Sequence, residues 1–173
     1  VAEFNRIAPN QAWLERHAPE FARAARWIVG ERAKTMQVPG NGPKPPEYGL
    51  APPYNLADWG AYAYYFAGNG YFYAGLKGAA DLLKQAGHPD AEAFEREAAE
   101  FRQSILDAFR WSQGRTPVRP LLDGTWVPAS PSQVHVHGST IDYFFESDSG
   151  RCQGYDVELG SHHLVPQGVI GLA

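Results

Sequence analysis

The sequence comprises 173 residues, carries a formal net charge of −4 and contains a single cysteine, Cys152. The acidic balance excludes the basic surface that nucleic-acid binding requires, and no apolar run is long enough to cross a membrane. A lone cysteine cannot form an internal disulfide bond, so cysteine usage leaves the redox compartment open.

Residues 10–36 form the first predicted helix, because apolar side chains recur there at three- and four-residue spacing. Pro19 interrupts this pattern, so the helix either kinks at this point or begins anew with Pro19 in its first turn. The prolines and glycines of residues 37–57 exclude regular structure and predict a long loop. The first third of the chain is therefore a helix followed by a loop.

Two more helices are expected, over 58–86 and 89–113. Gly87 suits the C-terminal cap of the first and Pro89 the first turn of the second. Residues 61–80 are apolar or aromatic nearly all round, which indicates a helix that is covered on most sides. The 89–113 helix carries one narrow apolar stripe and therefore belongs on an outer surface. We expect the 58–86 helix to be the most buried element, with antiparallel neighbours.

The pattern changes to a loop and β region over 114–160. Asp123-Gly124 favours a type I′ hairpin turn between residues 117–122 and 125–129, and its prolines confine this hairpin to an edge. Residues 134–137 and 141–145 are candidate strands, and residues 161–173 are expected to start another buried helix. The predicted fold class is mainly α, a single helical domain or a fragment of a larger one, with a small β-hairpin inserted in a long loop.

The order of elements also predicts where a site would lie. If inner and outer helices alternate, both long loops enter inner helices at their N-terminal ends and therefore share one rim. Loops on a rigid scaffold commonly carry binding sites. Tyrosines with apolar faces and polar tips crowd the 58–86 segment, and such surfaces suit partly apolar, hydroxylated ligands. We therefore expect a carbohydrate ligand at this rim.

The segments GLAPP and ADWGAYAYYFAGNGYFYAGLKGAADLL resemble the six-hairpin glycosidases, as do LLDGTWVPASP and YDVELGSHHLV. The resemblance covers the chain from about Pro19 onward. It implies an (α/α) toroid of alternating inner and outer helices, with the active site at the rim where the inner helices begin. A complete toroid has six helical hairpins and this chain holds about two, so the resemblance implies a partial toroid.

Glycoside hydrolysis generally uses two carboxyl groups. Our candidate catalytic residues are Asp58, whose neighbour Trp59 would raise its carboxyl pKa, and the pair Asp156 and Glu158. We expect Asp58 to share a cleft with at least one acid between 142 and 158. Each acid has a structural alternative, because aspartate also caps helices well and both 156 and 158 suit a helix entry.

The candidate sugar-binding residues are Trp59, Tyr62, Trp126, His162 and His163. Tyr62 is favoured over the other tyrosines because it is expected in the first helical turn, nearest the rim. Several aromatics between 62 and 73 must instead form the core, since they exceed one helix face. The histidines and Cys152 match no zinc-binding spacing, so we predict no metal site and no cofactor.

The C-terminal segment SHHLVPQGVIGLA is expected to begin an apolar helix that has no room to finish. An open toroid would leave apolar faces of the 58–86 helix and of this segment exposed, and large apolar patches usually mark an interface. We therefore expect self-association, or pairing with a missing remainder of the chain. The alternative to an enzyme is a non-catalytic glycan-binding or assembly module with the same aromatic rim.

Overall fold

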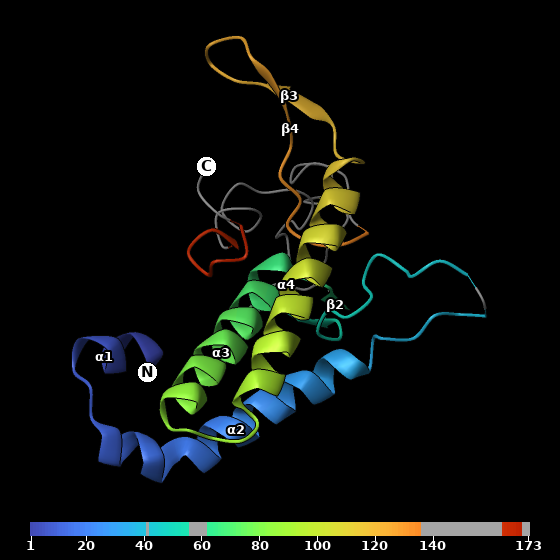
Figure 1. Ribbon diagram of the computed structural model, residues 1–173. Helices are drawn as coiled ribbons and strands as arrows, with labels where there is room; N and C mark the ends of the chain where they lie inside the picture. The colour runs from blue at the N-terminus through green and yellow to red at the C-terminus, as the bar shows by residue number, and fades with distance from the viewer. Residues whose placement is uncertain (41, 56–61, 136–163, 171–173) are drawn as a thin grey trace.

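The computed structural model describes residues 1–40, 42–55, 62–135 and 164–170 (Figure 1). The described chain is mainly helical with two short antiparallel strand pairs. Its elements are, in chain order, α1 (Ala2–Ile7), α2 (Gln11–Ala33), β1 (Tyr54–Asn55), β2 (Tyr62–Ala63), α3 (Phe66–Gln85), α4 (Ala91–Gln113), β3 (Val118–Pro120) and β4 (Trp126–Pro128).

Helix α2 is continuous through Pro19. Its N-cap is Asn10, whose side chain accepts a hydrogen bond of 3.0 Å from the backbone of Trp13 and so satisfies one free N–H group of the first turn. Buried residues at 14, 18, 22, 25 and 28 give the helix one inward face. The alternative of a new helix beginning at Pro19 is therefore wrong, because burial of this face holds both halves in one helix.

Helix α3 starts at Phe66, eight residues later than predicted. The residues before it form β2, where Tyr62 pairs with Asn55 and Ala63 pairs with Tyr54 of β1. Aromatic residues favour strands when a partner strand is available, and the preceding loop returns to supply one. The prediction of a helix from residue 58 was therefore wrong over 62–65, and residues 56–61 lie outside the described residues.

The expectation that this central helix is the most buried is confirmed. Ten of the 20 residues of α3 are buried, against six of 23 in α2 and eight of 23 in α4. Helix α3 packs against both other long helices. The start of α2 lies beside the end of α3, where the Gln11 side chain donates to the backbone oxygen of Gln85, so these two helices run antiparallel.

A tight turn joins α3 to α4 and makes this pair antiparallel as well. Gly87 has a φ of 67°, and His88 donates to the backbone oxygen of Leu83 at 2.9 Å, as in a Schellman motif. The predicted apolar stripe of α4 is confirmed, since Phe94, Ala98, Phe101, Ile105 and Phe109 are all buried. No described helix is sufficiently long and apolar to span a bilayer.

The hairpin forms where the sequence predicts it, with Val118 opposite Pro128 and Pro120 opposite Trp126. Its turn differs from the prediction. Gly124 has a φ of 85° but Asp123 does not have the positive φ that type I′ requires. The backbone of Gly124 donates to Leu121, and Leu121 donates to Thr125, which closes a three-residue loop ending in a glycine bulge.

The C-terminal segment is described over residues 164–170. Leu164 and Val169 are fully buried in the main core. Gly168 has a φ of 74°, and Val169 donates to the backbone oxygen of Leu164 at 2.9 Å, which forms a second Schellman motif. Residues 165–168 form a turn, so the helix expected over 161–173 does not form there. Residues 136–137 and 141–145, which held candidate strands, lie outside the described residues, and residues 134–135 form a turn.

Candidate functional site

Most of the predicted site residues lie outside the part of the chain that the structure describes: Asp58, Trp59, Asp156, Glu158, His162 and His163. The predicted cleft between Asp58 and the acids of 142–158 falls there too. Tyr62 and Trp126 are described, and each is exposed, by 71% and 64%. Tyr62 belongs to β2 and not to a first helical turn, so that reason for choosing it was wrong.

Trp126 lies on β4, in the hairpin that projects beyond the C-terminal end of α4 (Figure 1). Tyr62 lies on β2, just before the start of α3, and Figure 1 shows β2 well away from the hairpin. The structure therefore does not combine these two aromatic side chains into one binding surface. Instead it places Tyr62 next to a polar cluster whose members are far apart in the sequence.

At the centre of this cluster, His135 Nε2 and Glu47 Oε2 are hydrogen-bonded at 2.9 Å. The two side chains are 46% and 23% exposed, so the pair is open to solvent on one side. The His135 ring meets the ring of Trp111 edge-on at 5.4 Å and that of Tyr64 at 6.4 Å. The imidazole thus stands between two aromatic rings, and the Glu47 carboxylate is bonded to it.

The backbone around α3 fixes this arrangement. Val134 donates to the backbone oxygen of Tyr64, and Phe66 donates to that of Ser132, so residues 132–134 are bound to the entry of α3. His135 follows with a φ of 72°, which a residue other than glycine rarely adopts. Backbone strain of this kind concentrates at functional sites.

The pKa of the Tyr64 hydroxyl is shifted by the same surroundings. Burial raises the pKa of its hydroxyl, and the nearby Glu47 carboxylate and Tyr62 raise it further. The phenol therefore stays protonated at neutral pH and can donate a hydrogen bond. The cluster offers a donor, a carboxylate acceptor and an imidazole within one aromatic frame.

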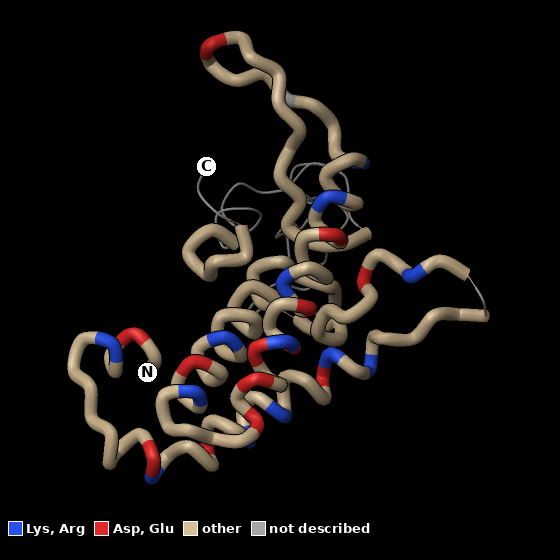
Figure 2. Tube along the Cα trace, in the orientation of Figure 1, with Lys and Arg blue, Asp and Glu red and all other residues tan. Residues whose placement is uncertain are grey.

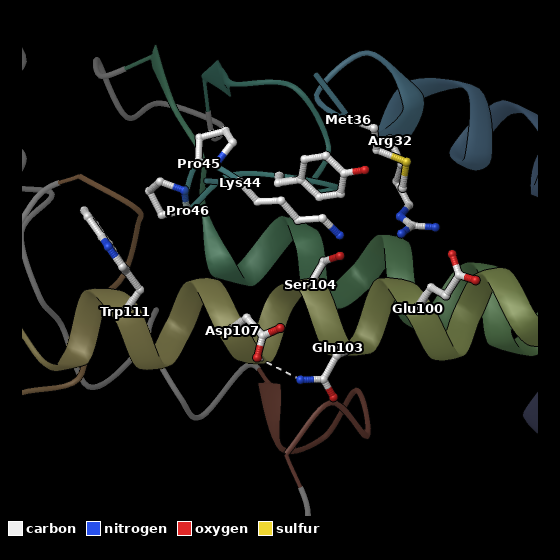
Figure 3. Close-up of a pocket in the computed structure, with 11 residues that line it drawn as sticks. Arg32, Met36, Lys44, Pro45, Pro46, Glu100, Gln103, Ser104, Asp107 and Trp111 are labelled. Carbon is white, nitrogen blue, oxygen red and sulfur yellow. Dashed lines mark hydrogen bonds between the residues drawn. The ribbon is translucent and has the colours of Figure 1, made fainter. Parts of the chain in front are cut away.

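A groove of about 570 Å³ adjoins this cluster. It lies between the end of α2, the loop before β1 and the C-terminal half of α4 (Figure 3). Trp111 lines the groove and also contacts His135, so the two features meet at this side chain. The groove mixes apolar and polar side chains, which are Arg32, Met36, Lys44, Pro45, Pro46, Tyr48, Glu100, Gln103, Ser104, Asp107 and Trp111. Its volume suits a ligand of small-molecule size.

Arg32 holds the loop side of the groove in place. Its Nε donates to the backbone oxygen of Gly49 at 3.0 Å, and its Nη1 donates to the Glu97 carboxylate at 2.8 Å. The guanidinium also lies over the Phe101 ring, 4.6 Å from its centre. Burial lowers the pKa of Arg32, while Glu97 and Glu100 oppose this effect. The side chain is 1% exposed and therefore serves as a rigid charged support.

The charges on the described helices alternate in sign (Figure 2). Within the described ranges no cluster of three or more His, Cys, Asp or Glu side chains is arranged to hold a metal ion. His135, one of the histidines considered as a ligand, is hydrogen-bonded to Glu47. The chemistry that the described cluster can offer is hydrogen bonding and proton exchange by Glu47, His135 and Tyr64.

No protein-family model, curated protein or solved structure matches this chain. The resemblance to six-hairpin glycosidases therefore rests on the quoted sequence segments alone. The candidate site is defined by its own geometry.

Proposed function

We propose that this chain is a carbohydrate-active protein that holds a sugar at the cluster of Glu47, Tyr64, Trp111 and His135. The observation that carries the proposal is the 2.9 Å Glu47–His135 pair, whose imidazole contacts two aromatic rings. Sugar rings pack an apolar C–H face on aromatic side chains and direct hydroxyl groups to polar partners. This cluster provides both kinds of contact at one solvent-open position.

We further propose that α2, α3 and α4 are the outer, inner and outer helices of a partial (α/α) toroid. The burial of α3 between two less buried antiparallel helices supports this assignment. Glu47, Tyr64 and His135 all come from the segments at the N-terminal end of α3. The resemblance to six-hairpin glycosidases implies an active site at this end of the inner helices.

The proposed reaction is hydrolysis of a glycosidic bond, which needs an acid and a base carboxyl group about 5 to 10 Å apart. Glu47 is a new candidate for one of these groups. Asp58, Asp156 and Glu158 remain candidates for the other. Trp59, His162 and His163 remain proposed sugar contacts, as does Tyr62, which lies next to Tyr64.

One observation favours the alternative of a glycan-binding module without catalysis. The Glu47 carboxylate is already hydrogen-bonded to His135, an arrangement that suits a fixed acceptor for a sugar hydroxyl. A binding module would need this pair and the aromatic frame but no second carboxyl group. Both versions of the proposal predict that sugar binding depends on Glu47.

The test is calorimetric titration with a panel of oligosaccharides, combined with hydrolysis assays on aryl glycosides. Replacing Glu47 by Gln removes the charge but keeps the shape, and we expect sugar binding to weaken about tenfold because hydrogen bonds to charged groups are strong. The control is Glu92→Gln, at an exposed position in the first turn of α4 outside the site.

Hydrolysis by the wild type that disappears in Glu47→Gln would support the enzyme. Binding without hydrolysis would support the glycan-binding module. If no sugar of the panel binds or is cleaved, the proposed function is wrong.

A further inference from the structure

One donor of the buried Arg32 side chain is left unused at the floor of the groove. Nε and Nη1 are hydrogen-bonded to the loop and to α4, but the buried Nη2 has no hydrogen-bond partner among the described residues. A buried donor without an acceptor costs about 1–3 kcal/mol. Arg32 lines the groove, so a ligand oxygen that reached this covered nitrogen would satisfy the donor.

Three further polar side chains of the groove form no hydrogen bond or ion pair with another residue in the described part of the chain. The Lys44 ammonium lies over the Tyr48 ring at 4.3 Å and forms no ion pair there. The Ser104 hydroxyl and the Glu100 carboxylate also lack a hydrogen bond to any described residue. Figure 3 shows Lys44 reaching from the loop toward Arg32 and Ser104, with Glu100 on the next turn of α4. Donors and an acceptor therefore face the same space.

The charges of the groove select the kind of ligand. Two cationic side chains, Arg32 and Lys44, and two carboxylates, Glu100 and Asp107, line it. A ligand carboxylate would be attracted by Lys44 but repelled by the two acids. A ligand ammonium group would be repelled by the two cations. The balance favours an uncharged group that both accepts and donates hydrogen bonds.

We propose that the groove is a subsite for the acetamido group of an N-acetylated amino sugar, which rests on the proposed sugar-binding function. The carbonyl oxygen would accept from Arg32 Nη2 and Lys44, and the amide N–H would donate to Glu100. The methyl group would contact Met36 and Tyr48. Trp111 joins the groove to the Glu47–His135 pair, so one oligosaccharide spans both.

The experiment compares three β-1,4-linked trisaccharides that differ only at carbon 2, made of N-acetylglucosamine, glucosamine or glucose. We expect calorimetry to show the N-acetylated trimer binding about tenfold more tightly than the other two, the effect of one hydrogen bond to a charged group. Lys44→Met and Glu100→Leu should each remove this preference. Both positions are exposed, so neither change threatens folding.

Lys34→Met and Glu92→Leu are the matched controls, because these residues are exposed and do not line the groove. They should retain the preference. Equal binding of the N-acetylated and glucose trimers would overturn the subsite while leaving the proposed function intact. A preference that survives in both Lys44→Met and Glu100→Leu would also overturn it. Failure of all three trimers to bind would instead count against the proposed function.

Discussion

His135 combines an unfavourable backbone conformation with two specific contacts. Its φ of 72° is uncommon for any residue other than glycine, although histidine adopts it more often than most, and its ring is bound to Glu47 and packed against Trp111. Hydrogen bonds of residues 132 and 134 to the entry of α3 hold the backbone in place. Strain that the fold maintains in this way is consistent with a functional role.

Two substitutions separate the backbone strain from the side-chain contacts. His135→Asn and His135→Val both remove the imidazole, but asparagine tolerates a positive φ and a β-branched residue does not. We expect the Val variant to be less stable than the Asn variant by about 1–2 kcal/mol in urea unfolding. Equal stabilities would show that the backbone at residue 135 relaxes freely. Sugar binding should weaken in both variants.

The residues of this cluster show what the sequence could not predict. Glu47 and His135 are 88 positions apart, and no local pattern links them. The sequence did indicate that the Pro-rich loop carries binding residues, and Glu47 follows Pro45-Pro46 in that loop. Trp111 reads as part of the amphipathic 89–113 helix, and only the tertiary structure brings it beside His135.

At the scale of elements, the start of α3 depends on a close contact with the returning loop. The Tyr54 ring of β1 packs against Tyr65 and Phe72, and its hydroxyl lies against the backbone of Gly68. A Cβ atom on Gly68 would lie 1.4 Å from that hydroxyl oxygen. Gly68 therefore permits the strand pair to lie across the first turn of α3.

Helix α3 contains a matched pair of glycines that tests this contact. Gly68→Ala should destabilise the fold by about 1–3 kcal/mol, because Tyr54 must move out of a packed position. Gly75→Ala, in the same helix, would place a Cβ 3.6 Å from Ile28, an ordinary contact. It should stabilise the fold by about 0.5–1 kcal/mol through helix propensity. Thermal unfolding of both variants measures the difference, and a stabilising Gly68→Ala would contradict the packing described here.

The helices could be predicted from the sequence where local residue spacing alone determines their apolar face or their end. The stripe of α4 and the glycine cap of α3 follow from local spacing and are confirmed. The start of α3 was predicted wrongly because β1 and residues 132–134, distant in sequence, bind the residues before it. The prediction of a C-terminal helix was wrong over 165–168, because Gly168 closes a turn that apolarity alone does not reveal.

At the scale of the whole molecule, the exposed apolar side chains differ from those expected. The described parts of α3 and of the C-terminal segment are largely covered, with Leu164 and Val169 fully buried. Large apolar side chains are exposed instead on α1 and on the β3–β4 hairpin. They include Phe4 and Ile7 at 71% and, at the hairpin tip, the fully exposed Leu122.

We propose that self-association uses the hairpin rather than α3. The hairpin projects from the body of the molecule and exposes Val118, Leu121, Leu122 and Trp126, and apolar clusters of this kind mark interaction sites (Figure 1).

Sedimentation velocity at micromolar concentration should therefore show dimers or larger species. The double variant Leu122→Ser and Trp126→Ser should sediment as a folded monomer, because both side chains are exposed. Ala99→Ser, exposed on α4, is the control and should associate like the wild type. A wild-type protein that remains monomeric over the whole concentration range would contradict association through this surface.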